Sequence, residues 1–206
     1  MRNAILEEAS RIVAEDGLEA LSIRAIARNL GYSAGALYEY FRDKDAIIHG
    51  LYFKGADGVG AAMERGLSAL PDDVDVLEEL RTLARIYRAH ALANPDLFRL
   101  GLSMVMCVDD WDSDPDDPVS QGGYPFLRNA IVRGQAESVL VDMPTPVILA
   151  GAWSLVHGFV ALELTNHLTG GDTPWQTPED PAEAMARRDA AFEGVLDTFL
   201  FGITRR

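Results

Sequence analysis

Hydrophobic positions recur every three or four residues along most of the chain, which is the period of an amphipathic α-helix. In the first fifty residues this pattern predicts a helix over 3–16, a short helix from Ser22 to Gly31, and another short helix after Ser33. Serine is a preferred N-cap of helices and glycine a preferred residue at their C-terminal ends, so these boundaries have a chemical basis. Two short helices joined by a tight turn indicate a helix-turn-helix motif.

The rest of the sequence has the pattern of longer helices. A fourth helix is predicted from Lys44, capped by Asp43, although three glycines inside it each cost about 1 kcal/mol of helix stability relative to alanine. The pattern predicts an all-α protein with a helix-turn-helix domain at residues 1–46 and a second helical domain at residues 47–206. The longer helices are expected over 44–69, 74–93, 96–108, 124–140, 145–169 and 182–203.

Composition narrows the class of protein. The 206 residues are 48% hydrophobic and 24% charged, which excludes a disordered chain and a low-complexity fibre. A single cysteine, Cys107, excludes an internal disulfide framework and an all-cysteine zinc site. Every apolar run of about 18 residues contains a charge or a helix breaker, so we expect no membrane-spanning helix. Glu7 and Glu8 stand where a signal peptide needs its apolar core, so we expect a cytoplasmic protein.

Charge is distributed unevenly along the chain. The formal net charge of −14 argues against a general nucleic-acid coat protein. Residues 22–44 differ, because they carry four basic side chains and two acidic ones. Small residues at 34–36 would let a helix backbone approach phosphates closely, and Tyr38 and Tyr40 add hydroxyl groups that can bond phosphate oxygens. These features favour a DNA-reading helix over the alternative, an ordinary three-helix core with Tyr38 packed inward and Arg28 merely solvated.

The segment LSIRAIARNLGYSAGALYEYFRDKDAI resembles the DNA-binding domain of TetR-family regulators, and its Leu-Tyr-x-Tyr-Phe-x-x-Lys run at 37–44 is the most specific part of that resemblance. The resemblance covers roughly residues 3–50. It implies an all-helical homodimeric repressor that binds a palindromic double-stranded DNA operator and releases it when a small-molecule effector occupies the C-terminal domain. Many members carry Lys or Gln where this chain has Ala34. The implied DNA contacts are Arg24, Ser33, Ala34, Gly35, Ala36, Tyr38, Tyr40 and Lys44.

A second resemblance lies near the C-terminus. Trp153, His157 and Gly158 form the Trp-x-x-x-His-Gly pattern that marks a subgroup of TetR-type C-terminal domains. In this fold the last two long helices form a four-helix dimer interface, and the helices expected over 145–169 and 182–203 have suitable lengths and apolar stripes. The resemblance therefore assigns ligand binding and dimerisation to residues 47–206.

The expected effector is small and largely apolar, because the candidate pocket residues offer apolar walls with few polar groups. The alternative is that most of these side chains belong to the ordinary core, since Met and aromatic stripes pack cores far more often than they bind ligands. No cofactor is expected. The candidate walls are Phe98, Leu102, Met106 and Trp153, and the candidate polar anchors are Tyr87, His90 and His157.

Two clusters of potential metal ligands are interpreted as ordinary structure. In 109–118 the aspartates alternate as in an EF-hand loop, but Pro115 and Gln121 replace the glycine and glutamate which that loop requires, so we expect a solvated acidic loop. Glu163 and His167 lie four residues apart on one helix, where they can share a metal. Two ligands are half a site at most, so we expect a surface Glu–His pair and a buried, hydrogen-bonded His157 instead.

The chain has no nucleophile elbow, phosphate-binding loop or metalloprotease motif, so we expect that it is not an enzyme. The alternative function is a helical binding protein or an enzyme that merely keeps a helix-turn-helix head.

Overall fold

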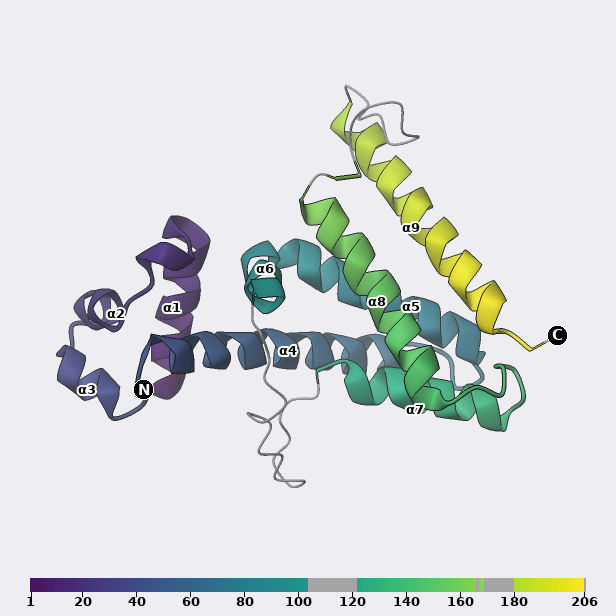
Figure 1. Cartoon of the computed structure of the whole chain (residues 1–206), viewed down its shortest axis with the longest axis horizontal. Helices are drawn as coiled ribbons and strands as arrows, with labels where there is room; N and C mark the ends of the chain where they lie inside the picture. The colour runs from purple at the N-terminus through teal and green to yellow at the C-terminus, as the bar shows by residue number, and fades with distance from the viewer. Residues whose placement is uncertain (104–121, 166, 169–179, 206) are drawn as a thin grey trace. The chain divides into compact units, whose positions relative to one another are not determined.

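The computed structural model describes residues 1–103, 122–165, 167–168 and 180–205, and helices dominate this part of the chain (Figure 1). The predicted all-α fold is confirmed, with a helix-turn-helix at the N-terminal end of the chain. The α-helices are α1 (Arg2–Asp16), α2 (Ile23–Leu30), α3 (Ala34–Tyr38), α4 (Lys44–Ser68), α5 (Val76–Ala93), α6 (Pro95–Ser103), α7 (Tyr124–Ala136), α8 (Thr145–Leu164) and α9 (Pro181–Ile203), with a short 3₁₀ helix at Leu18–Ala20.

The chain packs into two compact units. Met1–Gly58 and Asn94–Gly122 form the first unit, and Val59–Ala93 and Gly123–Arg206 form the second. Helix α4 begins in the first unit and ends in the second. The predicted division into functional domains at residues 46 and 47 stays a prediction, because packing units and functional domains are different properties.

The first unit has a core built from the apolar faces of its helices. Ile5 of α1, Ile26 of α2, Leu37 of α3 and Ile47 of α4 are all fully buried in it. Leu100 of α6 completes the same core. One buried face per helix is what the three-to-four-residue hydrophobic period requires, and it fixes which residues of α2 and α3 face solvent.

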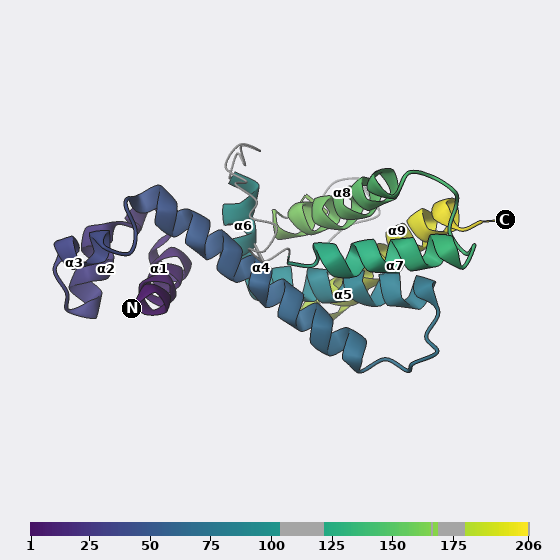
Figure 2. The ribbon, with the colours of Figure 1, turned by 90° about the horizontal axis from the view of Figure 1, so that it is seen from below.

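The second unit is a helical bundle in which α5 packs against α7 and α8, and α8 packs against α7 and α9 (Figure 2). Leu83, Ile131, Val160 and Leu200, one from each of these helices, lie in its buried core. Near the C-terminus Leu140 and Thr204 form an isolated antiparallel bridge. This bridge ties the end of α9 to the segment between α7 and α8.

Two predicted helix ends are wrong. The helix predicted over 124–140 ends at Ala136, because the chain turns at Ser138, whose φ of 59° lies in the left-handed region, and Leu140 then joins the bridge to Thr204. The helix predicted over 145–169 ends at Leu164. The acidic loop at 109–118 lies outside the described residues.

Within the part of the chain that the structure describes, α8 is the one helix long and apolar enough to cross a membrane. By length and composition alone it can cross a membrane, with a mean hydropathy of 1.7, and the core helix of a soluble protein meets the same criterion. One third of its apolar window is buried inside the protein. Exposed Val147, Trp153 and Leu162 therefore leave an apolar surface on this helix.

Candidate nucleic-acid interface

Two short-range hydrogen bonds and one glycine determine the ends of the helices in the helix-turn-helix. The Ser22 hydroxyl accepts from the amide of Ala25 at 3.1 Å, and the Ser33 hydroxyl accepts from the amide of Ala36 at 3.2 Å. Each serine thus satisfies one of the free amide groups at a helix start. Gly31 has a φ of 74°, a left-handed conformation that glycine adopts without strain, and it ends α2 two residues before the next cap.

Most of the predicted DNA contacts lie on the surface that this motif presents to solvent. Arg24, Ser33 and Gly35 are exposed, and so are Tyr38 and Tyr40. Tyr38 is 55% exposed, so the alternative in which this ring belongs to the core is wrong. The exposed candidates therefore combine the guanidinium of Arg24, the hydroxyl groups of one serine and two tyrosines, and the open backbone at Gly35.

Ala34 and Ala36, the remaining candidates on α3, are both half-buried, but their surroundings differ. Ala34 packs against the buried core of the first unit, on the same face of α3 as fully buried Leu37. Residues three apart on a helix share a face, so Ala34 belongs to the inward side of α3.

Lys44 has a structural contact that the sequence did not indicate. Its side chain is half-buried, and its ammonium donates a hydrogen bond of 3.0 Å to the backbone carbonyl of Leu18. This bond joins the start of α4 to the 3₁₀ helix that precedes α2. An ammonium group has three donors, so this contact leaves two for other partners.

Arg2 was not among the predicted residues, yet its side chain contacts the segment that follows α3. Its guanidinium lies 4.4 Å from the centre of the Phe41 ring and donates to the backbone carbonyl of Tyr40 at 3.3 Å. A guanidinium over an aromatic ring is attracted by the ring's negative face. The bond spans 38 positions of the chain, so no local sequence pattern could have revealed it.

In the second unit, three of the predicted effector residues lie together. The Tyr87 hydroxyl and Nδ1 of His157 are 2.6 Å apart, which is hydrogen-bond distance. The Trp153 and His157 ring centroids lie 6.4 Å apart. Burial lowers the pKa of His157, because desolvation penalises the charged imidazolium. The cluster therefore pairs two aromatic rings with a neutral imidazole.

The other effector candidates lie on α5, on α6 and beyond the described residues. His90 is half-buried on α5. Phe98, half-buried, and Leu102, exposed, are on α6 and belong to the first unit. Met106 lies outside the described residues.

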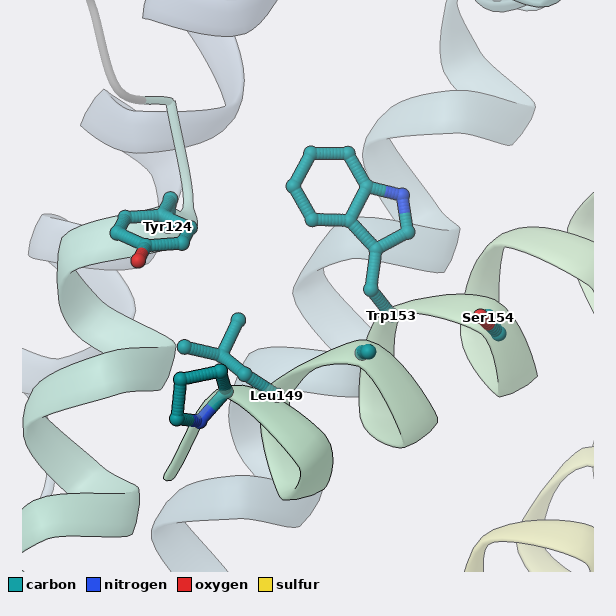
Figure 3. Close-up of a pocket in the computed structure, with 6 residues that line it drawn as sticks. Tyr124, Leu149, Trp153 and Ser154 are labelled. Atoms are coloured by element: carbon teal, nitrogen blue, oxygen red, sulfur yellow. The ribbon is translucent and has the colours of Figure 1, made fainter. Parts of the chain in front are cut away.

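A shallow apolar groove of about 280 Å³ opens beside this cluster, at the starts of α7 and α8 (Figure 3). In Figure 3 the Tyr124 and Trp153 rings stand on either side of it, with Leu149 between them. Trp153 links the groove to His157. The remaining lining residues, which sequence reasoning missed, are Tyr124, Pro146, Leu149, Ala150 and Ser154.

A buried ion pair joins α5 to α8. The Arg88 guanidinium donates two hydrogen bonds of 2.8 Å to the carboxylate of Glu163, whose side chain is 4% exposed. This contact raises the pKa of Arg88. The surface Glu–His pair predicted for Glu163 and His167 is therefore wrong, because Glu163 is buried against Arg88 and His167 bonds the Thr165 hydroxyl at 2.7 Å.

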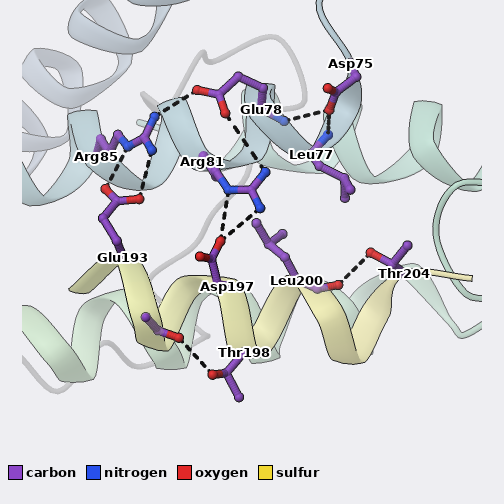
Figure 4. Close-up of polar contacts among 11 residues, drawn as sticks. Asp75, Leu77, Glu78, Arg81, Arg85, Glu193, Asp197, Thr198, Leu200 and Thr204 are labelled. Atoms are coloured by element: carbon purple, nitrogen blue, oxygen red, sulfur yellow. Dashed lines mark hydrogen bonds and ion pairs between the residues drawn. The ribbon is translucent and has the colours of Figure 1, made fainter. Parts of the chain in front are cut away.

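A ladder of ion pairs continues from Arg88 along α5 and α9, and we call it the α5–α9 ladder. Arg88 also bonds Asp189, and the next two rungs are Arg85 with Glu193 and Arg81 with Asp197. Figure 4 shows these two rungs, which are partly exposed to solvent. Partly exposed ion pairs of this kind contribute little to the stability of a protein.

Comparison with known proteins decides the family. Residues 5–51 match the model of bacterial regulatory proteins of the TetR family, and residues 80–197 match that of the tetracyclin repressor-like C-terminal domain. The chain belongs to the TetR family of transcriptional regulators. The predicted family is thereby confirmed, together with DNA binding through a helix-turn-helix. Members of this family are regulators and are generally not enzymes.

One characterised relative matches only part of this chain. The HTH-type transcriptional repressor Rv1474c of Mycobacterium tuberculosis is 32% identical over 95 residues, which make up 42% of this chain and 51% of that repressor. The match thus spans about half of the relative's length.

Two solved structures share the fold over nearly the whole chain. A protein of unknown function from Rhodococcus sp. RHA1 has a TM-score of 0.73 at 23% identity, with coverage of 99% of this chain and 95% of that one. A TetR family transcription regulator from Marinobacter aquaeolei VT8 has a TM-score of 0.68 at 22% identity, with coverage of 100% and 96%. At these identities the structures support the fold alone.

Proposed function

We propose that this TetR-family regulator is a repressor that binds a palindromic operator as a homodimer and is released by a small, largely apolar effector. The observation that carries the proposal is the exposed surface of the helix-turn-helix, where Arg24 of α2, Tyr38 of α3 and Tyr40 just after α3 are all open to solvent. Hydroxyl groups and cations of this kind bond DNA phosphates and fix a protein's register on the duplex.

Exposed apolar side chains on α8 and α9 support the homodimer. Val147 and Leu162 on α8 are 51% and 45% exposed, and Met185 and Phe201 on α9 are 63% and 67% exposed. Exposed apolar patches on stable helices are typical of interfaces between protein chains. Two such helices from each of two subunits make a four-helix bundle with two-fold symmetry. This symmetry is what a palindromic operator requires of its reader.

The cluster of Tyr87, Trp153 and His157, with the adjoining groove, supports effector binding in the second unit. Aromatic walls with a few polar atoms suit a small apolar ligand, and the groove's volume lies near the lower end of the range for such sites. Helix α4 connects the two units and carries Gly55, Gly58 and Gly60. A ligand that prefers one conformation of the dimer lowers operator affinity by its differential affinity for the two conformations.

Hydroxyl-radical footprinting on the DNA upstream of the protein's own gene tests the dimer and the palindrome together. We expect two protected half-sites whose centres lie about 34 Å apart, one helical turn, or a multiple of that distance. A single protected half-site contradicts the homodimeric reader.

A matched pair of variants tests the placement of the reading surface. Arg24→Ala removes an exposed cation of α2, and Arg11→Ala removes one from α1, where it is paired with Glu8 and Glu15. Both variants lose one positive charge from the first unit, so general electrostatic effects are equal. We expect Arg24→Ala to weaken operator binding at least about tenfold, as loss of one good base or phosphate contact does, and Arg11→Ala to bind nearly as the wild type does. Equal losses contradict the placement.

A further inference from the structure

Tyr40 lies in the short segment that connects α3 to α4, outside both helices. Its backbone amide donates to the carbonyl of Leu37 on α3 at 3.0 Å. Its backbone carbonyl accepts from the guanidinium of Arg2 at 3.3 Å, and in the described part of the chain no backbone amide donates to it. The two polar backbone groups of Tyr40 are therefore bonded to different helices, the amide to α3 and the carbonyl to α1.

The next residue gives Arg2 a second contact. The guanidinium carbon of Arg2 lies 4.4 Å from the centre of the Phe41 ring, and this ring belongs to the core of the first unit, with only 2% of the residue exposed. A cation over an aromatic ring is attracted by the ring's negative face. Because the core fixes the Phe41 ring, the contact holds the guanidinium beside the carbonyl of the preceding residue. Arg2 thus connects the start of α1 to the backbone of Tyr40.

The side chain of Tyr40 is 42% exposed, whereas Arg2 bonds its backbone. We propose that Arg2 is a positioning residue for DNA binding, which holds the Tyr40 backbone in the conformation that directs the phenol hydroxyl to an operator phosphate. A side chain whose backbone is already ordered loses less conformational entropy when it binds. This inference rests on the proposed function, in which the Tyr40 hydroxyl bonds a phosphate. It adds a residue of α1, outside the helix-turn-helix, to the DNA-binding machinery.

The expected effect follows from the strength of the contact that Arg2 makes. An exposed contact between a guanidinium and an aromatic ring changes an equilibrium constant by about two- to fivefold. Affinity falls by the factor by which the binding-competent conformation becomes less populated, which we take as about threefold for one helix-turn-helix. A two-fold symmetric dimer has two of them, so we expect Arg2→Ala to lower specific affinity about tenfold.

A double-mutant cycle tests whether Arg2 acts through Tyr40. Tyr40→Phe removes the hydroxyl and keeps the ring and the carbonyl. Affinities of the wild type, both single variants and the double variant for the DNA upstream of the protein's own gene are measured by fluorescence anisotropy, with a shuffled sequence as the non-specific reference. We expect Arg2→Ala to cost about tenfold in the wild type and less than about twofold in Tyr40→Phe, because a hydroxyl that is absent cannot be positioned. Equal losses in the two backgrounds, or no loss in either, overturn the inference.

The salt dependence of binding separates positioning from a direct contact with DNA. If the Arg2 cation neutralised one phosphate in each half-site, Arg2→Ala would make the slope of log affinity against log salt less steep by about 1.8. We expect a nearly unchanged slope, because the guanidinium stays on Phe41 and the Tyr40 hydroxyl is neutral. A decrease of about 1.8 in steepness overturns the inference.

Two further variants control for charge and for folding. Arg11→Ala removes another cation of α1, which is paired with Glu8 and Glu15, and we expect it to bind nearly as the wild type does. A loss as large as that of Arg2→Ala means that general electrostatics cause the effect, and it overturns the inference. Arg2→Met removes the cation and keeps most of the packing of the side-chain stem, so it repeats the cycle independently of how well Arg2→Ala folds. Equal losses of Arg2→Met with and without the Tyr40 hydroxyl also overturn the inference.

Failure of the proposed function gives a different result. In that case the wild type binds the upstream DNA no better than the shuffled sequence, which overturns both the function and the inference. A clear preference for the upstream sequence that Arg2→Ala leaves unchanged overturns the inference alone.

Discussion

Replacing Glu163 by glutamine removes one charge from the buried ion pair between α5 and α8 and keeps the shape of the side chain. In the native protein both carboxylate oxygens accept bonds of 2.8 Å from Arg88, whose guanidinium also lies 5.0 Å from the centre of the Phe192 ring. The Arg88 side chain is only 12% exposed. The variant therefore leaves a poorly hydrated cation facing an amide, and part of that amide is itself a donor.

The size of the effect follows from this burial. Removing one partner of a buried ion pair costs about 3–5 kcal/mol, because the other charge stays buried without compensation. Asp189 still bonds Arg88 at 2.7 Å, so we expect the lower end, about 3 kcal/mol. For a chain of this size, that loss lowers the melting temperature by about 6–12 °C. The matched control is Glu193→Gln on the partly exposed rung with Arg85, where we expect a loss of about 0–1 kcal/mol.

Thermal and urea unfolding at one fixed protein concentration measure both variants, because the stability of a dimer depends on concentration. We expect Glu163→Gln to be clearly less stable than Glu193→Gln, because only the first variant leaves a buried charge without its partner. If the two variants lose the same stability, the ion pair of Glu163 contributes no more than a surface pair, and the argument from burial is wrong.

Three further predictions test other contacts. Burial lowers the pKa of His157, so the neutral imidazole stabilises the fold fully above pH 6.5, and this stabilisation is lost as the pH falls below that value. Unfolding curves should therefore show a loss of stability below pH 6.5, and His157→Gln should reduce that loss. An unchanged pH dependence in the variant contradicts the assignment to His157. Phe201→Asp should convert the dimer to a monomer in sedimentation experiments, whereas Val132→Asp, an exposed control on α7, should not; a dimeric Phe201→Asp protein contradicts the interface. Lys44→Ala should lower the free energy of unfolding by about 1 kcal/mol, because its bond to the Leu18 carbonyl is lost; urea unfolding without this change means that the bond adds nothing.

Much of the fold was predictable because local chemistry determines it. Ser22 and Ser33 cap α2 and α3 as the sequence indicates, and the Asp43 carboxylate accepts from the amide of Ala46 at 2.8 Å at the start of α4. Gly31 adopts the expected left-handed conformation. These signals lie within four residues of the groups they satisfy, so a single sequence contains them in full.

Contacts between distant segments could not be predicted in the same way. Helical periodicity continues to Leu140, but a bridge to Thr204, far along the chain, removes this residue from α7. The sequence alone predicts Glu163 as a surface residue near His167, whereas in the structure α5 places Arg88 against its carboxylate. The partner in each case is 60 or more positions away, and nothing in the local pattern specifies it.

The same limit applies to the candidate sites. The exposed residues of the helix-turn-helix follow from one amphipathic face, so periodicity places them well. The groove depends on how α7 and α8 pack, so only Trp153 among its described lining residues was predicted.

A salt titration of DNA binding tests the central claim most directly. If the tyrosines and cations of two helix-turn-helix surfaces contact one operator, the logarithm of the binding constant falls linearly with the logarithm of salt concentration, with a slope of about −0.9 per phosphate neutralised. We predict such a slope for the DNA upstream of the protein's own gene, with affinity at least about 1,000-fold above that for a shuffled sequence at physiological salt. Equal affinities for the two DNAs, with the same slope, would contradict the account of this chain as a sequence-specific regulator.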